Sequence, residues 1–498
     1  MMMPVRYLTY FSILFLLFGC RTFRSSYDPN RAYSAEQLKQ DFELTEQVLA
    51  KTHPSLYWHI TPDSLTKVIQ SCKQRIQDSM TADQFQWQVM APFLHEIRCG
   101  HTTVGRSRKA TNWLKKNPAP YLPLQVKNWK DTLVVMAAER RSDSLFRRGI
   151  QLIAIDGISV SEIIHRMHQV LSLDGYASTV NEARISSNFA GLHRQLFGIR
   201  EKYGITYLDS NGLVKTDSVK LYRPGKKDSG SVASKKQSAT KSAKPKKKTP
   251  KLERYRSLSI DSSNQWAIMR LNSFQKGHLR HFFKQSFKSL HEKNIPNLIL
   301  DLRANGGGYV QLSTKLTRYI SRKPFRVADS AYAITRNTRT FRRYFNGWIT
   351  QDIGLRIMSG TKRGNHFPAY AFERKWHKPY SKHHYNGHVY VLTAGQTFSA
   401  STLFANAIKG QQGITIVGEE TGGGHYGNSG IIIPTFTLPH TQLRVRYPLY
   451  RLVQFNHQEN TKGKGIQPDW EIPPQMDAIK KGIDLKMKLV KDRIQGKL

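Results

Sequence analysis

The segment from Val391 to Gly410 places three hydroxyl side chains at the start of a predicted helix. Its sequence, VLTAGQTFSASTLFANAIKG, runs from an apolar strand pattern through Thr397, Ser399 and Ser401 into a helical pattern. Ser and Thr side chains commonly cap a helix by accepting hydrogen bonds from the free N–H groups of its first turn. The same N–H groups can instead stabilise the oxyanion that forms when a serine attacks a carbonyl. The segment on its own is compatible with both roles.

Candidate partners for such a nucleophile lie far away in the sequence. A serine hydroxyl needs a neighbouring base, and an imidazole with an ordinary pKa of about 6.5 suits that task near neutral pH. His101 lies in the loop-like sequence CGHTTV, while His425 and His457 follow the serine cluster. The glycine run at 306–308 could let a backbone N–H approach a substrate closely. In isolation, a loop histidine is more typical of a surface, and a glycine run of a turn.

Alternating strand and helix patterns predict the domain that carries the serine cluster. Apolar strand-like segments alternate with helical segments from residue 253 to residue 475. This order predicts a layered α/β catalytic domain with parallel strands, and such domains bind ligands at the carboxyl ends of their strands. The glycine run and the serine cluster both fall at that edge. A C-terminal helix is expected over residues 476–498.

Two further folded regions precede this domain. Apolar residues recur at helical spacing within residues 33–110, which predicts a helical N-terminal domain. Short strand patterns dominate residues 120–223. Within them, FRRGIQLIAIDGISVSEIIHRMHQVL resembles the core of a PDZ domain, which binds a peptide by adding it as a strand to a sheet edge. The expected fold class is therefore a multidomain α/β protein with a PDZ-like, β-rich domain.

The chain is strongly basic. It has 77 Lys and Arg residues against 35 Asp and Glu residues, a formal net charge of +42. Residues 224–252 contain ten of the lysines and almost nothing that could form a core, which predicts a disordered Lys-rich linker. No zinc-finger spacing or RNA-binding aromatic signature accompanies the charge, so we expect no specific nucleic-acid partner. Contact with anionic lipid headgroups is another explanation of the charge.

The N-terminal residues predict export. Arg6 precedes the apolar run YFSILFLLFG, which is too short to span a bilayer and is typical of a signal peptide over residues 1–19. The run ends in LFGC, which resembles a bacterial lipobox in which Cys20 is lipidated. This resemblance implies a membrane-anchored lipoprotein that faces the periplasm, with the outer membrane as its expected location. A plain signal peptide and a retained anchor are the alternatives.

The remaining cysteines and the sequence motifs give no sign of a bound metal or cofactor. Beyond Cys20 the chain has only Cys72 and Cys99, which could form a disulfide in an oxidising compartment or stay as two buried thiols. No grouping of His, Cys and carboxylate residues has the spacing of metal ligands, and no glycine motif for phosphate opens a helix. We therefore expect neither a metal nor a cofactor.

Four segments in chain order are similar to one family. They are the Gly-His loop CGHTTV, the PDZ-like region, DLRANGGG, and TFSAST followed by VGEETGGG. Together they resemble the tail-specific and C-terminal-processing serine peptidases, including the tricorn-like branch, over about residues 35–471. The resemblance implies a crotonase-like catalytic domain. It also implies a serine-type endopeptidase that hydrolyses protein or peptide substrates captured by their C-terminal tails.

The resemblance assigns roles to residues of this chain. Ser399, the first serine of the SAS run, is the expected nucleophile and forms an acyl-enzyme, while the N–H groups of Ala400 and Gly307 form the oxyanion hole. The Ser-Lys branch of the family has a lysine where this chain has Gly424. The tricorn-like branch uses a histidine from the N-terminal region, which makes His101 the expected base.

The other members of the site are less clearly assigned. His425, next to the vacant lysine position, is the alternative base, and His457 is a weaker one. In the tricorn-like branch a late acidic residue orients the histidine, and Glu459 is the nearest candidate because Lys462 stands where that acid is common. The uncertain acid motivates an alternative function, a catalytically inactive peptide-binding envelope protein with the same fold.

Several charged residues near these motifs have expected structural roles. We expect Asp301 and Arg303 to hold the glycine loop and Asp469 to close the last strand. Glu419 and Glu420 either support their loop or are solvated charges.

Overall fold

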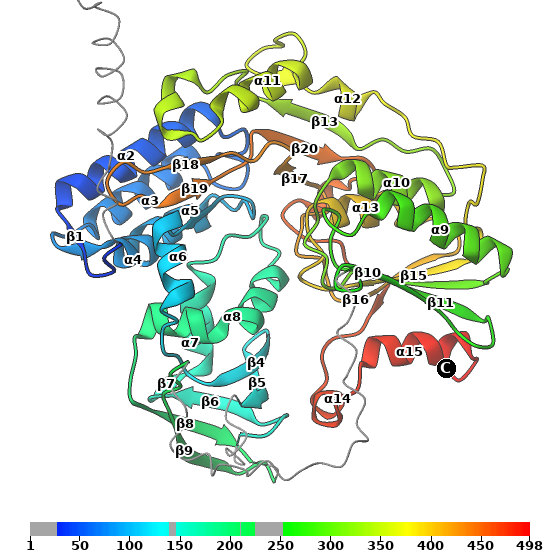
Figure 1. Ribbon diagram of the computed structural model, residues 1–498, viewed down its shortest axis with the longest axis horizontal. Coiled ribbons are helices and arrows are strands. Elements are labelled where there is room, and N and C mark those ends of the chain that lie inside the picture. The colour runs from blue at the N-terminus through cyan, green and yellow to red at the C-terminus, as the bar shows by residue number, and fades with distance from the viewer. Residues whose placement is uncertain (1–26, 139–145, 210, 225–251) are drawn as a thin grey trace, which may run out of the picture.

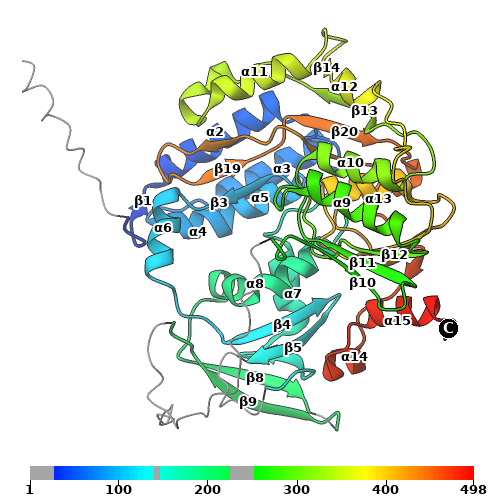
Figure 2. The same cartoon turned by 45° about the vertical axis from the view of Figure 1, so that its right-hand side comes forward.

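A computed structural model describes residues 27–138, 146–209, 211–224 and 252–498. The predicted signal peptide, Cys20 and nearly all of the Lys-rich linker lie outside the described residues. Figures 1 and 2 show a helical N-terminal region, a β-rich region below it, and an α/β region beside both. Within the described ranges, no helix combines the length and apolar character needed to cross a membrane.

The N-terminal region is built from short helices. Its longest helix, α2 (Ala35–Thr52), begins at Ser34, whose hydroxyl accepts a hydrogen bond from the Gln37 N–H while the Gln37 side chain accepts one from Ser34 N–H. Helical spacing turns Leu38 and Phe42 into the core, where both are fully buried. The remaining elements of the region are β1 (Ala32–Tyr33), α3 (Pro62–Gln74), β2 (Met80–Thr81), α4 (Ala82–Phe85), η2 (Gln86–Met90), α5 (Ala91–Glu96), β3 (Thr103–Gly105) and α6 (Arg108–Lys116).

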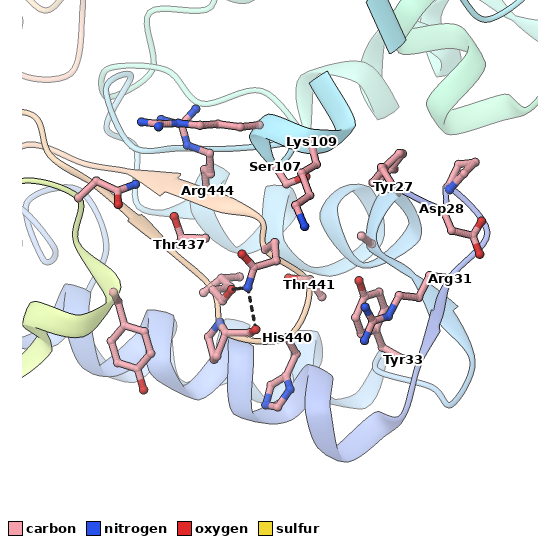
Figure 3. A pocket seen from close by; sticks show the side chains of 18 of the residues that line it. Tyr27, Asp28, Arg31, Tyr33, Ser107, Lys109, Thr437, His440, Thr441 and Arg444 are labelled. Atoms are coloured by element: carbon pink, nitrogen blue, oxygen red, sulfur yellow. Dashed lines mark hydrogen bonds between the residues drawn. The ribbon is translucent and has the colours of Figure 1, made fainter. Parts of the chain in front are cut away.

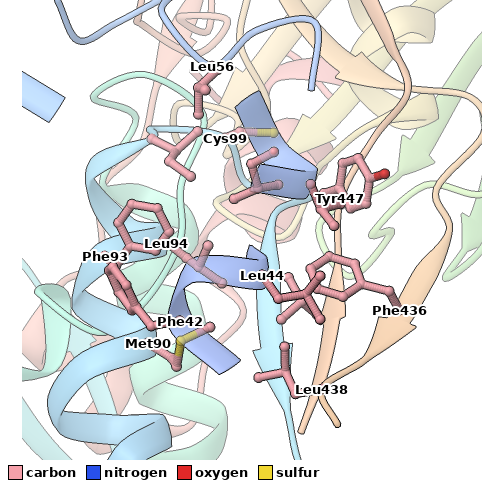
Figure 4. Close-up of a cluster of buried hydrophobic side chains, with 14 of the residues drawn as sticks. Phe42, Leu44, Leu56, Met90, Phe93, Leu94, Cys99, Phe436, Leu438 and Tyr447 are labelled. Atoms are coloured by element: carbon pink, nitrogen blue, oxygen red, sulfur yellow. The ribbon is translucent and has the colours of Figure 1, made fainter. Parts of the chain in front are cut away.

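These helices share one hydrophobic core with a late part of the chain. Figure 4 shows Phe42 and Phe93 in the same buried cluster as Phe436 and Tyr447. Phe436 lies on β18 and Tyr447 directly follows β19, and this part of the chain contributes to two small sheets, of strand order β14-β13-β20-β17 and β18-β19-β3. Their strands are β13 (Ala328–Ala333), β14 (Phe367–Pro368), β17 (Gly427–Gly430), β18 (Thr435–Thr437), β19 (Arg444–Arg446) and β20 (Tyr450–Gln454). Strand β3 pairs antiparallel with β19, so the N-terminal region is joined to the α/β region through a sheet.

The β-rich region is a six-stranded antiparallel sheet with two helices. The strand order is β4-β5-β6-β8-β9, and a short strand, β7, pairs with β6. The apolar sides of the sheet and helices form a separate core. Its elements are β4 (Leu124–Trp129), β5 (Thr132–Ala138), β6 (Gln151–Ile155), β7 (Ile158–Ser159), α7 (Val160–His168), α8 (Thr179–Phe197), β8 (Lys202–Leu208) and β9 (Val214–Lys220).

The α/β region contains a six-stranded sheet of order β10-β11-β12-β15-β16-β21. Within this sheet, strands β11, β12, β15, β16 and β21 run parallel to one another, and only β10 is antiparallel to its neighbour. Helices α9, α10 and α13 pack on one face of this sheet, around a core of buried Leu, Ile and Phe residues. The elements are β10 (Arg256–Ile260), β11 (Trp266–Leu271), α9 (Leu279–Glu292), β12 (Asn297–Asp301), α10 (Val310–Ile320), β15 (His388–Thr393), α13 (Ala400–Ile408), β16 (Ile414–Gly418) and β21 (Trp470–Glu471).

The C-terminal segment differs from the single helix expected over 476–498. It forms two helices, α14 (Met476–Lys481) and α15 (Leu485–Ile494). Gly482 ends α14 in a left-handed conformation with φ of 67°, which a glycine adopts readily. Helix α15 buries Val490 against the second face of the large sheet, together with Leu392.

The segment between α10 and β15 was not assigned by the sequence patterns. Besides β13 and β14 it contains η3 (Arg339–Tyr344), α11 (Trp348–Met358) and α12 (Tyr370–Glu373). Figure 1 shows α11 at the outer edge of the molecule, at the end away from the β-rich region. The two cysteines in the described part of the chain, Cys72 and Cys99, are free and buried. Of the two readings left open by the sequence, the structure therefore has the pair of buried thiols.

Candidate active site

Ser399 lies in the turn that joins β15 to α13, immediately before the first helical residue, Ala400. Its side chain makes no capping hydrogen bond. Instead, Thr397 supports the turn, because its hydroxyl accepts from the Ala394 N–H at 3.1 Å and donates to the Leu302 carbonyl at 3.0 Å. Ordinary capping therefore does not explain why a serine occupies position 399.

The backbone of Ser399 is strained. Its φ of 57° and ψ of −121° fall in a region that residues other than glycine rarely adopt. Strain of this kind costs on the order of 1–3 kcal/mol and is concentrated at functional sites. The conformation holds a half-buried Ser399 side chain at the N-terminal end of α13, where the helix dipole favours negative charge.

His101 is brought to Ser399 across 298 positions of the sequence. Its Nε2 lies 3.1 Å from the Ser399 Oγ, and its ring packs against the Phe398 ring with the centroids 4.8 Å apart. Burial, with the positive charges of Arg446 and Arg184, lowers the pKa of His101 to about 3. The imidazole is thus neutral near pH 7, and the unprotonated Nε2 can accept the serine proton.

The other ring nitrogen of His101 has no acidic partner in the described part of the chain. Nδ1 is buried and makes no hydrogen bond. The structure therefore shows a Ser-His pair, and it contains no described carboxylate bonded to the imidazole.

A loop of the β-rich region holds the backbone around His101. The Asp174 carboxylate accepts a hydrogen bond from the Gly100 N–H at 2.7 Å, and the Ser172 hydroxyl donates to the Thr102 carbonyl at 2.5 Å. These two bonds act on the residues immediately before and after His101. The loop between α7 and α8 therefore fixes the position of the imidazole through the backbone.

Asp174 is buried in this loop, and Arg184, on α8, is half-buried beside it. Burial raises the pKa of Asp174 to about 6, against the lowering effects of the Gly100 and Gly424 N–H groups and of Arg184. Arg184 donates to the Ser172 carbonyl and lies over the Phe398 ring, 6.0 Å from its centroid. The sequence analysis missed both residues, since neither a charged side chain in a loop, such as Asp174, nor one on a helix, such as Arg184 of α8, carries a local sign of its long-range contacts.

The glycine run at 306–308 lies directly against the serine turn. The Phe398 N–H donates to the Asn305 carbonyl at 3.2 Å. A Cβ atom at Gly307 would lie 2.7 Å from the Ser399 Cβ and 2.9 Å from the Ala400 N, closer than side chains normally approach. Gly307 also has a φ of 94°, so both space and backbone conformation require glycine.

The two predicted oxyanion donors differ in their hydrogen bonding. As the first residue of α13, Ala400 has an N–H that no carbonyl of its own helix can receive. The Gly307 N–H donates to the Asn305 side-chain oxygen at 3.0 Å. A substrate oxygen could therefore use the Ala400 N–H directly, whereas the Gly307 N–H would have to share or leave its present partner.

Glu459 is not brought to His101. It lies on η4 (Glu459–Thr461), its side chain is 77% exposed, and its carboxylate is 3.6 Å from the His457 Nε2. The Nδ1 of His457 lies 2.9 Å from the Asp329 carboxylate. The spacing to the following glycines suggested Glu459, but the turn directs its side chain to solvent and to His457.

His425 is also directed elsewhere. It is 3% exposed, its pKa is lowered to about 4 by burial and by Lys409 and His457, and no hydrogen bond joins its ring to Ser399. Because His101 occupies the position beside the hydroxyl, it is the histidine whose geometry suits a base.

The neighbouring charged residues have structural contacts. Arg303 joins the Asp301 carboxylate at 2.8 Å and the Asp484 carboxylate at 2.7 Å, which ties the glycine loop to α15. The Asp469 carboxylate accepts from the Ile416 N–H at 2.8 Å and so closes the edge of the sheet. Lys486 pairs with Glu419 at 2.5 Å. In the described ranges, no group of three or more His, Cys, Asp or Glu residues could hold a metal ion.

A serine hydroxyl beside a neutral imidazole at a helix N-terminus is the arrangement of a serine-type hydrolase. Residues 265–472 match the model of peptidase family S41. Residues 265–472 therefore form a serine-type peptidase domain of family S41.

Comparisons with solved structures agree on the fold. The crystal structure of mature CPAF has a TM-score of 0.60 and 16% sequence identity, and the match covers 93% of this chain and 98% of that one. Mature CPAF complexed with lactacystin gives a TM-score of 0.61 at 15% identity, over 93% of this chain and 99% of that one. The similarity thus extends over all three regions of the molecule. No curated protein matches the sequence significantly.

Proposed function

We propose that this protein is an active serine endopeptidase with Ser399 as nucleophile and His101 as general base. The observation that carries the proposal is the 3.1 Å distance between the His101 Nε2 and the Ser399 Oγ. The Ser399 oxygen attacks the scissile carbonyl while His101 takes the hydroxyl proton. His101 then gives this proton to the leaving amine, and an acyl-enzyme remains on Ser399. Water hydrolyses the ester in the reverse sequence of proton transfers.

The negative charge of the tetrahedral intermediate would be stabilised beside the same turn. The free N–H of Ala400 is the first donor, and the Gly307 N–H is the second once a substrate oxygen competes with Asn305 for it. The strained backbone of Ser399 supports this proposal, because it orients the hydroxyl without engaging it in a cap.

We further propose that protein substrates are captured by their C-terminal tails in the β-rich region, in an envelope-anchored lipoprotein. The PDZ-like sequence around Asp156-Gly157 supports tail capture, and the lipobox-like sequence at Cys20 supports the location. A peptide series with free and amidated C-termini tests the first point. Equal binding of both forms to the protein would contradict tail capture.

The Ser399→Ala variant tests the nucleophile, and Ser401→Ala is its matched control. Ser401 is the second residue of α13, two positions after Ser399, and its hydroxyl is buried without a hydrogen-bond partner. We expect Ser399→Ala to abolish peptide hydrolysis and labelling by a fluorophosphonate, while Ser401→Ala keeps both. The reverse result would assign the chemistry to Ser401. A well-folded wild-type protein that neither hydrolyses peptides nor reacts with the probe would instead be the catalytically inactive peptide-binding protein.

A further inference from the structure

Helix α11 exposes three isoleucines on one face. Ile349, Ile353 and Ile357 are spaced by four residues, so they lie in one row along the helix, and they are 55%, 51% and 80% exposed. We call this row the isoleucine face. The rest of the exposed large apolar residues in the described ranges are spread over other elements. A row of three on one helix is therefore a distinct apolar surface.

The opposite side of α11 explains how the helix is held without these isoleucines. Leu355 is fully buried in the N-terminal core, and the buried Asp352 carboxylate accepts hydrogen bonds from the Thr338 N–H at 2.7 Å and from its hydroxyl at 2.9 Å. The helix thus docks through Leu355 and Asp352. The isoleucine face contributes little to folding and is available to a partner.

The chain segment that carries the isoleucine face is strongly basic. Between residues 330 and 372 the chain has seven Lys or Arg residues and one acidic residue, Asp352, which is buried. In the described part of the chain, none of the seven forms a salt bridge. Six of them are exposed: Arg339, Arg342, Arg343, Arg356, Lys362 and Arg363. Their charge is therefore uncompensated within the protein.

One of the basic residues of η3, Arg343, also lines a cavity of about 820 Å³. Arg343 lines this cavity together with Arg31, Arg108 and Arg444, and Asp28 is its only acidic lining residue. Figure 3 shows Arg31 and Asp28 at one side of the cavity and Arg444 at the other. The Nε of Arg444 is buried and has no hydrogen-bond partner. The cavity is therefore suited to phosphate groups.

We propose that the isoleucine face and the exposed basic residues of η3 and α11 dock this protein onto an anionic phospholipid surface. The aliphatic side chains would enter the boundary between headgroups and acyl chains, while the Arg side chains contact phosphates. Each basic residue near such a surface strengthens the attraction to it. A lipid surface needs no shape complementarity, which suits an exposed helical ridge.

Two other occupants fit the surface less well. A second copy of this chain would bring its own Arg side chains against these, with no exposed acidic residue between 330 and 372 to compensate them. A nucleic acid or another polyanion would use the positive charge but would gain nothing from three isoleucines. Only an anionic lipid surface uses both features.

The test is vesicle flotation with the chain from residue 21, which keeps every residue that the structure describes. Vesicles of phosphatidylglycerol and phosphatidylcholine are compared with vesicles of phosphatidylcholine alone. We expect binding to the anionic vesicles only. The triple variant Ile349→Gln, Ile353→Gln, Ile357→Gln should bind about tenfold or more weakly, because binding scales with the buried apolar area.

The matched control removes three equally exposed apolar residues from another place. Ile199, Leu213 and Val214 are 49%, 60% and 65% exposed in the β-rich region, and their triple Gln variant should bind vesicles like the wild type. Hydrolysis of a soluble peptide should be unchanged in the isoleucine variant, which separates this proposal from the proposed catalysis.

Three results would overturn the docking proposal. The first is a wild type that does not bind anionic vesicles, and the second is an isoleucine variant that binds as tightly as the wild type. The third is a stable dimer in sedimentation velocity that the isoleucine variant abolishes, since the face would then be an interface between copies.

Discussion

The contact between the glycine run and the serine turn makes Gly307 the most informative position for mutation. An alanine there would place its Cβ 2.7 Å from the Phe398 carbonyl oxygen, 2.7 Å from the Ser399 Cβ and 2.9 Å from the Ala400 N. All three atoms belong to the turn that orients the nucleophile and the oxyanion donor. In the Gly307→Ala variant, the glycine run and the serine turn must therefore move apart.

The Gly307→Ala substitution should lower two separate quantities, the stability of the fold and the catalytic rate. A non-glycine residue in a left-handed conformation loses about 1–2 kcal/mol of stability. Displacing one oxyanion donor lowers kcat by about 10²–10³, which corresponds to about 3–4 kcal/mol of transition-state stabilisation. We therefore expect the Gly307→Ala variant to fold with a modestly lower Tm and to lose at least a hundredfold in kcat.

Gly306→Ala is the control because it lies one residue away in the same run. Its Cβ would meet no atom within 4 Å, and its φ is not positive. Peptide hydrolysis and the rate of fluorophosphonate labelling are measured for both variants, with Tm from thermal unfolding. If Gly307→Ala keeps its kcat, or if Gly306→Ala loses as much, the close contact between these two loops does not support catalysis.

Three other predictions test the base, its support and the buried histidines. His101→Gln should lower kcat/KM by about 10²–10⁴ while His425→Gln keeps it near the wild-type value, and the opposite order in a peptide hydrolysis assay would make His425 the base. Asp174→Ala should lower kcat because the Gly100 N–H loses its acceptor, and Asp174→Asn should restore most of it; equal losses in both variants would mean that the hydrogen bond does not position His101. Burial lowers the pKa of six histidines to about 4 or below, so they stay neutral in the folded protein while the unfolded chain takes up their protons below pH of about 6.5. The free energy of unfolding should therefore fall as pH is lowered from about 6.5 toward 4, by up to about 1.4 kcal/mol per pH unit for each histidine, and the raised pKa values of Asp41, Asp174, Glu182 and Glu420 oppose part of this fall. A denaturant midpoint that does not change between pH 7 and pH 4.5 would contradict the prediction that these buried histidines stay neutral. The six histidines with lowered pKa values are His53, His59, His101, His168, His193 and His425.

The sequence patterns predicted the large sheet because its signals are local. The alternation of strands and helices between residues 253 and 475 corresponds to the observed order of β11, α9, β12, α10, β15, α13 and β16. The expected strand and helix around the serine cluster are β15 and α13, with Ser399 at their junction. Apolar periodicity and glycine ends determine such elements without reference to the rest of the chain.

Long-range contacts explain what the patterns could not predict. Strand β3 has three residues and no distinctive alternation, yet its pairing with β19 ties the segment that follows His101 to the α/β region. Asp174 has the sequence of an ordinary loop residue, and its burial depends on contacts with Gly100, 74 positions earlier in the chain. Glu459 was chosen by its distance from a glycine motif, and such spacing does not determine where a side chain in a 3₁₀ turn points.

The two halves of the proposed catalytic pair come from different regions of the molecule. The segment that matches the peptidase family model, residues 265–472, contains Ser399 and the glycine run, but neither His101 nor Asp174. The base reaches the hydroxyl only because β3 pairs with β19 and because the loop between α7 and α8 holds Gly100 and Thr102 on either side of it. The α/β region alone thus contains the proposed nucleophile and oxyanion donors but not the proposed base. Catalysis therefore depends on how the N-terminal and β-rich regions pack against the large sheet, and a mutation that loosens this packing should lower kcat even where the sheet itself stays folded.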